Sequence, residues 1–204
     1  MNRTGLILVF FSLLLVSTLG IEMPLLSGDE AIGAVTFNEM WRNLLAGKAG
    51  IELNPITSYL GPLDLWLFGI FAWLPTVFDQ VQPHPWMVRL VPLILFLGSL
   101  VQLFREMRHS NSADREILPY LVVGVFGAMP LFAAHARVGW GPALSLGIST
   151  LLWAEVVRTE RAGTARWMLL GTWSGIALEF HPTSALTILG AVIWCAPALI
   201  ESLK

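Results

Sequence analysis

Long apolar blocks, separated by short polar stretches, constrain the fold of this 204-residue chain more than any other feature. A helix that crosses a bilayer needs about 20 mostly apolar residues, and about 17 are tolerated, so several blocks have a suitable length. In hydrocarbon a lone strand cannot satisfy its backbone hydrogen bonds, and we therefore expect the blocks to be helices. The blocks cover residues 6–20, 59–78, 87–104, 117–134, 143–157, 167–180 and 184–200.

The composition favours the same class of protein. Charged residues make up 13% of the chain, whereas soluble domains contain about 25%. The formal net charge of -2 argues against a nucleic-acid partner, which normally leaves a basic footprint. The single cysteine, Cys195, lies in an apolar run without a second thiol, which excludes a disulfide framework and a thiolate metal site. We expect one membrane domain.

The distribution of Lys and Arg predicts the orientation of the chain in the membrane. The basic residues cluster at Arg3, within 105–115, within 158–166 and at Lys204. The segment 22–86 has the opposite charge balance, with seven acidic residues and two basic ones. Cytoplasmic loops carry an excess of Lys and Arg. We therefore expect the basic clusters in the cytoplasm and the acidic first loop on the other side.

One apolar block must not cross if all basic clusters are to lie on the same side. The best candidate is 59–78, because it contains Asp64, two prolines and two tryptophans. An Asp in mid-bilayer costs about 2.5–3.5 kcal/mol on insertion scales, and Trp prefers the membrane interface. We interpret this block as a juxtamembrane or re-entrant helix on the outer leaflet.

The predicted fold is therefore an all-α integral membrane protein with about six transmembrane helices and a long outer loop over 22–86. We expect it in a plasma or inner membrane, with the first loop non-cytoplasmic. The predicted spans are 6–20, 87–104, 117–134, 143–157, 167–180 and 184–200. Block 6–20 could instead be a cleaved signal peptide, but Thr18-Leu19-Gly20 is a mediocre cleavage site, and we expect a retained helix.

The outer loop begins with a predicted amphipathic helix over residues 30–45. Ser27 or Asp29 can cap this helix, and Gly47 ends it. Such a helix could simply rest on the membrane surface. Asp29 and Glu30 at its start are favoured by the helix dipole alone, which is the simpler interpretation of these two carboxylates.

Six polar residues are predicted to gather at one outer membrane face. They are Asp29, Glu30, Arg89, His135, Arg137 and His181. Taken singly, each is more often an interfacial or snorkelling side chain than a catalytic one. Together, however, Arg, His and a carboxylate suit an anionic, phosphate-bearing substrate. Arg grips phosphate through paired hydrogen bonds, and a carboxylate can accept a proton.

A series of short motifs resembles the GT-C class of membrane glycosyltransferases, the superfamily of protein O-mannosyltransferases and aminoarabinose transferases. The motifs are Gly28-Asp29-Glu30-Ala31, Gly61-Pro62-Leu63-Asp64-Leu65-Trp66, Val88-Arg89-Leu90-Val91-Pro92, Met129-Pro130-Leu131-Phe132 with Ala136-Arg137, and the Gly-rich stretch 171–183. Their order matches the family over almost the whole chain. The family also keeps its Pro-Leu segment outside without crossing, which the charge pattern predicts independently.

The resemblance implies a sugar donor linked to polyprenyl phosphate and transfer at the outer membrane face. Asp29, with Glu30 beside it, would supply the catalytic base for an acceptor hydroxyl or amine. Arg89 or Arg137 would hold the donor phosphate, and His135 and His181 would contribute to substrate binding. The sequence identifies no cofactor, although a divalent metal ion would be compatible with this chemistry. The implied partners are membrane lipid and the lipid-linked sugar.

Departures from the family pattern keep other functions open. Pro142 stands where many relatives have an Asp, and Leu60-Gly61 replaces a Lys or His before the Pro-Leu motif. The resemblance also covers only the front module of the family. A non-catalytic membrane subunit, acting as a scaffold or lipid-binding partner in a larger complex, is therefore the alternative. A small transporter is a third reading, for which Glu155 and Glu179 are the only charges within later spans, both near span ends.

Overall fold

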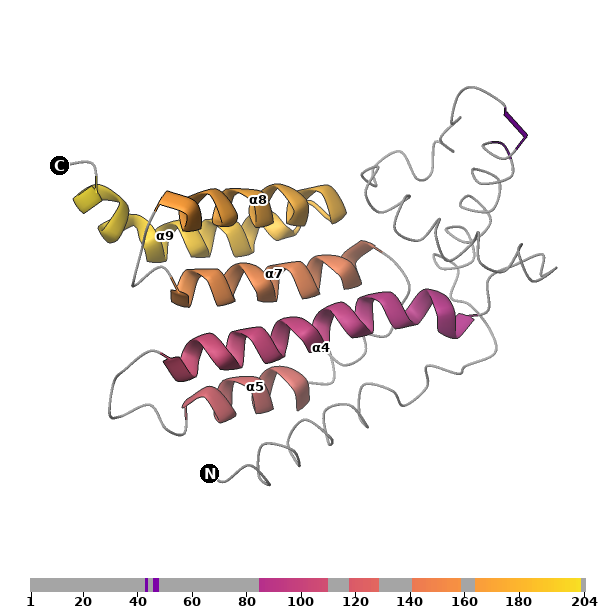
Figure 1. Ribbon diagram of the computed structural model, residues 1–204, viewed down its shortest axis with the longest axis horizontal. Coiled ribbons are helices and arrows are strands. Elements are labelled where there is room, and N and C mark those ends of the chain that lie inside the picture. Colours follow the sequence, from indigo (N-terminus) through magenta and orange to yellow (C-terminus); the bar gives the residue numbers. More distant parts are fainter. Residues whose placement is uncertain are drawn as a thin grey trace.

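The computed structural model describes residues 43, 46–47, 85–109, 118–128, 141–158 and 164–202. These residues form helices and no strand (Figure 1), which confirms the all-helical prediction for this part of the chain. The helices are α4 (Pro85–His109), α5 (Leu118–Ala128), α7 (Gly141–Arg158), α8 (Thr164–Phe180) and α9 (Ser184–Ser202). The predicted span 6–20 and the predicted helix 59–78 lie outside the described residues, as does nearly all of helix 30–45.

Proline and glycine mark several element boundaries. Pro85 opens α4, where its missing N–H would be unpaired in any case. Helix α8 ends before His181, because the proline that follows disfavours the helical conformation of the preceding residue. Gly47, where the sequence predicts a helix end, has a φ of 67°, a conformation that glycine often supplies after the last helical turn.

Helices α4 and α7 run parallel, side by side. Early in α7, Gly147 lies against Leu95 and Phe96 of α4. At the far end, Arg158 of α7 forms an ion pair with Glu106 of α4. Both helices therefore advance in the same direction along their shared contact.

Helix α8 returns against α7, and α9 then follows the direction of α7 again. Phe180, the last residue of α8, packs in one cluster with Leu144 near the start of α7. Ser184, the first residue of α9, is hydrogen-bonded to Ser145 of α7. Figure 1 shows the resulting stack, with α8 and α9 above α7, and α4 and α5 below it. Three described helices, α4, α7 and α9, thus begin at the same end.

The contact between α4 and α7 holds the tightest part of the core. Leu93, Phe96 and Leu100 of α4 are almost completely buried, as are Leu144 and Leu152 of α7. Gly147 allows this approach because it has no side chain. A Cβ atom at this position would lie 2.7 Å from Cγ of Leu95 and 3.2 Å from the backbone nitrogen of Phe96. Small residues permit such close packing of helices, in membranes as elsewhere.

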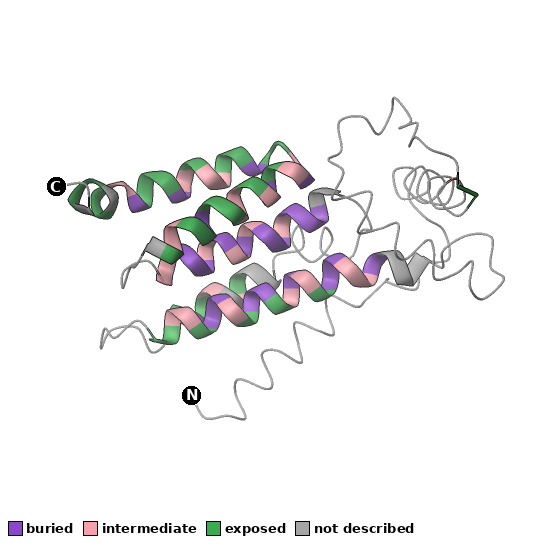
Figure 2. Ribbon diagram, turned by 45° about the horizontal axis from the view of Figure 1, so that its top comes forward, coloured by how far each residue is buried: buried purple, intermediate pink, exposed green. Residues whose placement is uncertain are grey.

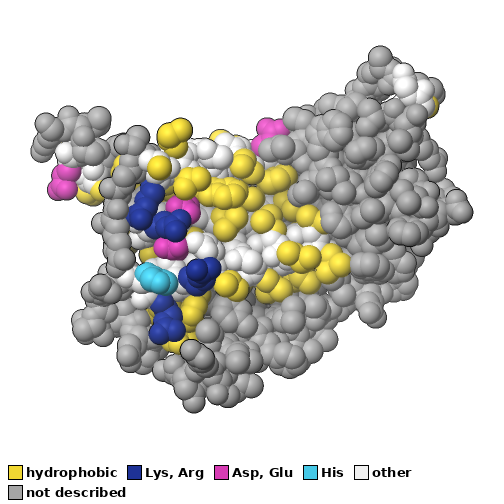
Figure 3. All heavy atoms as spheres, viewed as in Figure 1, with side chains coloured by type: hydrophobic (Ala, Val, Ile, Leu, Met, Phe, Trp, Pro, Cys, Tyr) yellow, Lys and Arg dark blue, Asp and Glu magenta, His cyan; other side chains and the backbone are white. Residues whose placement is uncertain are grey.

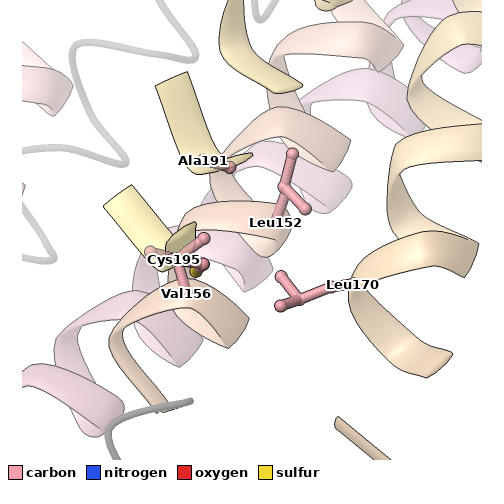
Figure 4. Close-up of a cluster of buried hydrophobic side chains, with 5 residues drawn as sticks. All are labelled: Leu152, Val156, Leu170, Ala191 and Cys195. Atoms are coloured by element: carbon pink, nitrogen blue, oxygen red, sulfur yellow. The ribbon is translucent and has the colours of Figure 1, made fainter. Parts of the chain in front are cut away.

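A second cluster joins α7, α8 and α9. It consists of Leu152, Val156, Leu170, Ala191 and Cys195 (Figure 4). The α9 members are small, and they face the larger aliphatic side chains of α7. This cluster holds α9 against α7 along the half that lies away from Ser184.

The outward surface of α8 and α9 is strongly apolar. Figure 2 shows exposed positions along both helices, and they include Leu186, which is 76% exposed, and Met168, which is 70% exposed. Val192, Ile193 and Trp194 of α9 are also exposed. Large apolar patches are uncommon on soluble monomers, and this surface fits contact with lipid or with another protein.

Three hydroxyl groups donate to backbone carbonyls of their own helix. Ser99 donates to the carbonyl of Phe96 at 2.7 Å, and Thr150 donates to the carbonyl of Leu146 at 2.9 Å. On the exposed side of α8, Thr172 donates to the carbonyl of Met168 at 2.9 Å. Intrahelical bonds of this kind need no water, so the hydroxyls are compatible with an apolar surrounding.

By length and composition, α4 is the described helix that can cross a membrane, over the 21 residues Arg89–His109. A shorter apolar helix covers Ser184–Ala198. The core helix of a soluble protein can meet the same criterion, so α4 supports membrane association without establishing several spans. The predicted six-span topology therefore stays a prediction.

The close approach at Gly147 predicts a difference between two glycine substitutions. Gly147→Ala should lower the free energy of unfolding by about 1–3 kcal/mol, because the new methyl group meets Leu95 and the α4 backbone. Gly98→Ala is the matched control, since a Cβ there has open space, and alanine should stabilise the helix by up to about 1 kcal/mol. Unfolding of the detergent-solubilised chain, followed by circular dichroism, measures both. Equal effects would contradict the packing.

Candidate functional site at one end of the bundle

Polar side chains gather at the end where α4, α7 and α9 begin and α8 terminates. We call it the Arg89 end, and its described polar residues are Arg89, Ser145, Glu179, His181 and Ser184. The opposite end, where α4 and α7 terminate, is called the Arg158 end. Two of the six residues predicted for the site, Arg89 and His181, belong to the Arg89 end.

Arg89 lies in the second turn of α4 and is only 6% exposed. A charged group at this degree of burial must be held by polar or charged surroundings, because its desolvation is costly. Two residues further along, Val91 packs on the cluster that contains Leu144 and Phe180. Since His181 directly follows Phe180, this packing brings Arg89 and His181 to the same end of the bundle.

His181 is oriented by the turn that joins α8 to α9. The backbone N–H of Thr183 donates to Nδ1 of His181 at 3.3 Å, and the Thr183 hydroxyl lies 2.8 Å from the same nitrogen. Nδ1 therefore acts as an acceptor, and in the neutral ring the proton is on Nε2. The residue is partly exposed, so the Nε2–H group can donate a hydrogen bond to a ligand.

Ser145 and Ser184 connect the first turns of α7 and α9. Their hydroxyl oxygens are 2.5 Å apart, and both residues are buried. The bond joins positions 39 residues apart in the chain. Sequence reasoning did not identify this pair, because two serines in separate apolar blocks carry no signal that they meet.

Glu179 is a further residue that the site prediction did not include. Its Oε1 atom is buried and has no hydrogen-bond partner among the residues that the structure describes. The sequence signal was present, since Glu179 is a carboxylate within an apolar block two residues before His181. A buried carboxylate oxygen at this end is available to accept a hydrogen bond from a donor that enters there.

The other predicted site residues lie outside the described part of the chain. These residues are Asp29, Glu30, His135 and Arg137. The catalytic roles of Asp29 and Glu30 therefore stay predictions from the sequence. The same holds for His135 and Arg137 as binding residues. Among the described residues, no group of three or more His, Cys, Asp or Glu side chains could hold a metal ion.

The Arg158 end holds a network of ion pairs and hydrogen bonds instead. Arg158 contacts Oε2 of Glu106 at 3.4 Å and Oε1 of Glu155 at 3.2 Å. Gln102 donates to Glu106 at 2.7 Å, and Arg166 donates to the backbone carbonyl of Arg158. Figure 3 shows basic and acidic side chains gathered at this end. The network fastens α4, α7 and α8 together, although Oε2 of Glu155 is buried without a hydrogen-bond partner among the described residues.

No protein-family model, curated protein or solved structure matches the chain. The function is therefore argued from the residues and their arrangement.

The Ser145–Ser184 pair predicts non-additive effects on stability. Ser145→Ala should cost about 1–3 kcal/mol, because it leaves the buried Ser184 hydroxyl without this partner. Ser184→Ala should cost a similar amount, and the double variant should cost less than the sum of the two. A double-mutant cycle of unfolding free energies measures the coupling. Simple additivity would show that the two hydroxyls do not depend on each other.

Proposed function

We propose that the chain is an integral membrane protein, similar to the front module of a GT-C glycosyltransferase, that binds a polyprenyl-phosphate-linked sugar at the Arg89 end. The observation that carries the proposal is the buried Arg89 at the same end as the oriented His181. The sequence predicts Arg89 as a candidate ligand of the donor phosphate and His181 as a substrate-binding residue.

The electrostatics of the Arg89 end suit a phosphate group. A guanidinium forms paired, charge-assisted hydrogen bonds with phosphate oxygens, and these are stronger where water is excluded. His181 adds an Nε2–H donor. The first turns of α4, α7 and α9 also lie there, and the positive end of a helix dipole favours an anion. The last turn of α8 and the carboxylate of Glu179 oppose this effect in part.

The apolar surface of α8 and α9 supports placement in a membrane. Exposed Leu186, Ile193 and Trp194 would face lipid there, and the helix hydroxyls would keep their intrahelical partners. The Arg158 end, with Arg105, Arg108 and His109 at the close of α4, would lie on the cytoplasmic side by the charge rule. The Arg89 end would then open to the outer face.

The proposed reaction transfers the sugar from polyprenyl phosphate to an acceptor hydroxyl or amine. Asp29 accepts the acceptor proton as the nucleophile attacks the anomeric carbon. The bond between that carbon and the phosphate oxygen breaks, and polyprenyl phosphate leaves as an anion held by Arg89. A single displacement of this kind inverts the anomeric configuration. A base is the principal group required, because phosphate is already a competent leaving group.

Asp29→Asn tests the transferase directly. Removal of a positioned general base should lower the transfer rate by about 10²–10⁴-fold. The assay uses membranes that contain the full chain, a panel of radiolabelled polyprenyl-phosphate sugars, and extraction of labelled acceptors. Glu39→Gln in the same loop is the matched control and should leave the rate unchanged. Full activity of Asp29→Asn would refute the base assignment.

Arg89→Gln tests the donor site separately. Loss of a charge-assisted hydrogen bond to phosphate should raise the KM for the donor by about tenfold or more, with a smaller effect on kcat. Arg105→Gln, at the opposite end of α4, should leave both parameters unchanged. Circular dichroism and gel filtration check that the buried substitution folds, and Arg89→Lys should be intermediate. If Arg89→Gln does not change donor binding and a partner protein co-purifies with the chain, a non-catalytic subunit would be favoured.

A further inference from the structure

A cavity of about 350 Å³ lies between α4, α5, α7 and α9, toward the Arg158 end of the bundle. Leu103 and Met107 of α4 form one side, Pro119 and Val122 of α5 another, and Trp153 and Trp194 come from α7 and α9. The cavity is therefore separate from the proposed donor site, because the donor site lies at the Arg89 end, where α4 and α7 begin.

The lining favours hydrocarbon. It is almost wholly apolar: apart from the two indole N–H groups, its polar group is the hydroxyl of Thr150, which already donates its proton to the carbonyl of Leu146. A polar ligand would lose its hydration there and find few partners, whereas an alkyl chain would gain from burial against the two indole rings. The volume is at the lower end of the range for ligand pockets, so it suits a single chain.

Cationic side chains follow the lining residue Met107 at the close of α4. Arg108 directly follows the lining residue Met107, and its guanidinium carbon lies 6.0 Å from the centre of the Phe104 ring. Phe104 in turn packs edge-on against Tyr120 of α5, next to the lining residue Pro119. Arg108 has no ion-pair partner among the residues that the structure describes. It is exposed and therefore available to an anion.

Arg105 has the same charge and is also exposed, but it lies on the side of α4 opposite the lining residues. It is two positions from each of the lining residues Leu103 and Met107, which is a rotation of about 200° around the helix axis. Arg158 follows the lining residue Val157, but its guanidinium is already paired with Glu106 and Glu155. Of these three described arginines, Arg108 is thus the best placed to complement an anionic headgroup at the cavity.

We propose that this cavity holds one acyl chain of an anionic glycerophospholipid, with the lipid phosphate at Arg108. The second chain stays in the bilayer. Basic side chains near the cytoplasmic surface attract anionic lipids, and each such residue contributes about fivefold in affinity. The inference rests on the membrane placement given under the proposed function, but not on the transferase chemistry.

Quenching of tryptophan fluorescence tests the proposal, because Trp153 and Trp194 line the cavity. The full chain is reconstituted in phosphatidylcholine bilayers that contain increasing fractions of dibrominated phosphatidylglycerol or dibrominated phosphatidylcholine. The cavity signal is the difference between the unmodified chain and the Trp153→Phe variant, because Trp153 is partly buried, whereas Trp194 is 64% exposed and also meets bulk lipid. We expect half-quenching of this signal at an about fivefold lower fraction of brominated phosphatidylglycerol than of brominated phosphatidylcholine.

Two matched arginine variants decide whether the headgroup is recognised at the cavity. Arg108→Gln should abolish the preference for phosphatidylglycerol, whereas Arg105→Gln should retain it. Val122→Phe should fill the cavity and reduce the quenching by both lipids. If this variant does not fold, as judged by circular dichroism, the two surface arginine variants still give the answer.

Three results would overturn the inference. The first is equal quenching of the cavity signal by both brominated lipids, and the second is an equal loss of preference in the two arginine variants. The third is relief of the quenching by unbrominated polyprenyl phosphate but not by unbrominated phosphatidylglycerol. That result would assign the cavity to a donor lipid. Failure of the membrane placement is distinguishable, since neither brominated lipid would then quench any tryptophan.

Discussion

The contact between α4 and α7 at Gly147 is the constraint on which the rest of the described structure depends. A side chain there would collide with Leu95 and with the backbone of α4, so the absence of a Cβ atom sets how closely the two helices approach. Because they run parallel, their first turns meet at one end and their last turns at the other. Each end thereby collects side chains that are far apart in the sequence.

The two ends have different electrostatic characters. At the Arg158 end, two glutamates, a glutamine and two arginines form ion pairs and hydrogen bonds that fasten three helices, while Oε2 of Glu155 is buried without a partner among the described residues. At the Arg89 end, a buried guanidinium, an oriented imidazole and a buried carboxylate oxygen are combined with three helix N-termini. The first arrangement serves stability, whereas the guanidinium, the imidazole and the helix N-termini of the second suit an anionic ligand, an effect that the Glu179 carboxylate opposes. In the proposed function the donor phosphate binds there, and the cavity beside Arg108 adds a separate place for a lipid chain.

Much of the helical pattern can be predicted from the sequence. The blocks 143–157 and 167–180 lie within α7 and α8, and the break before α9 follows from Pro182. Helix α4 continues to His109, five residues beyond the predicted block 87–104, because charged side chains end an apolar run without ending the helical backbone. Arg89 and His181 were selected from motif and charge patterns. Ser145, Ser184 and Glu179 were not, since burial and pairing leave no local signal.

The sequence by itself determined that the described chain is helical, that Pro182 breaks the helical run before α9, and that charge is distributed unevenly along it. These properties follow from local backbone chemistry and from the cost of placing charge in apolar surroundings. Only the tertiary structure decided that α4, α7 and α9 run parallel, that Arg89 is buried and that Ser145 meets Ser184. It also decided that a cavity remains between four helices. Such features depend on which helix faces which, and that choice is made by packing between residues distant in the chain.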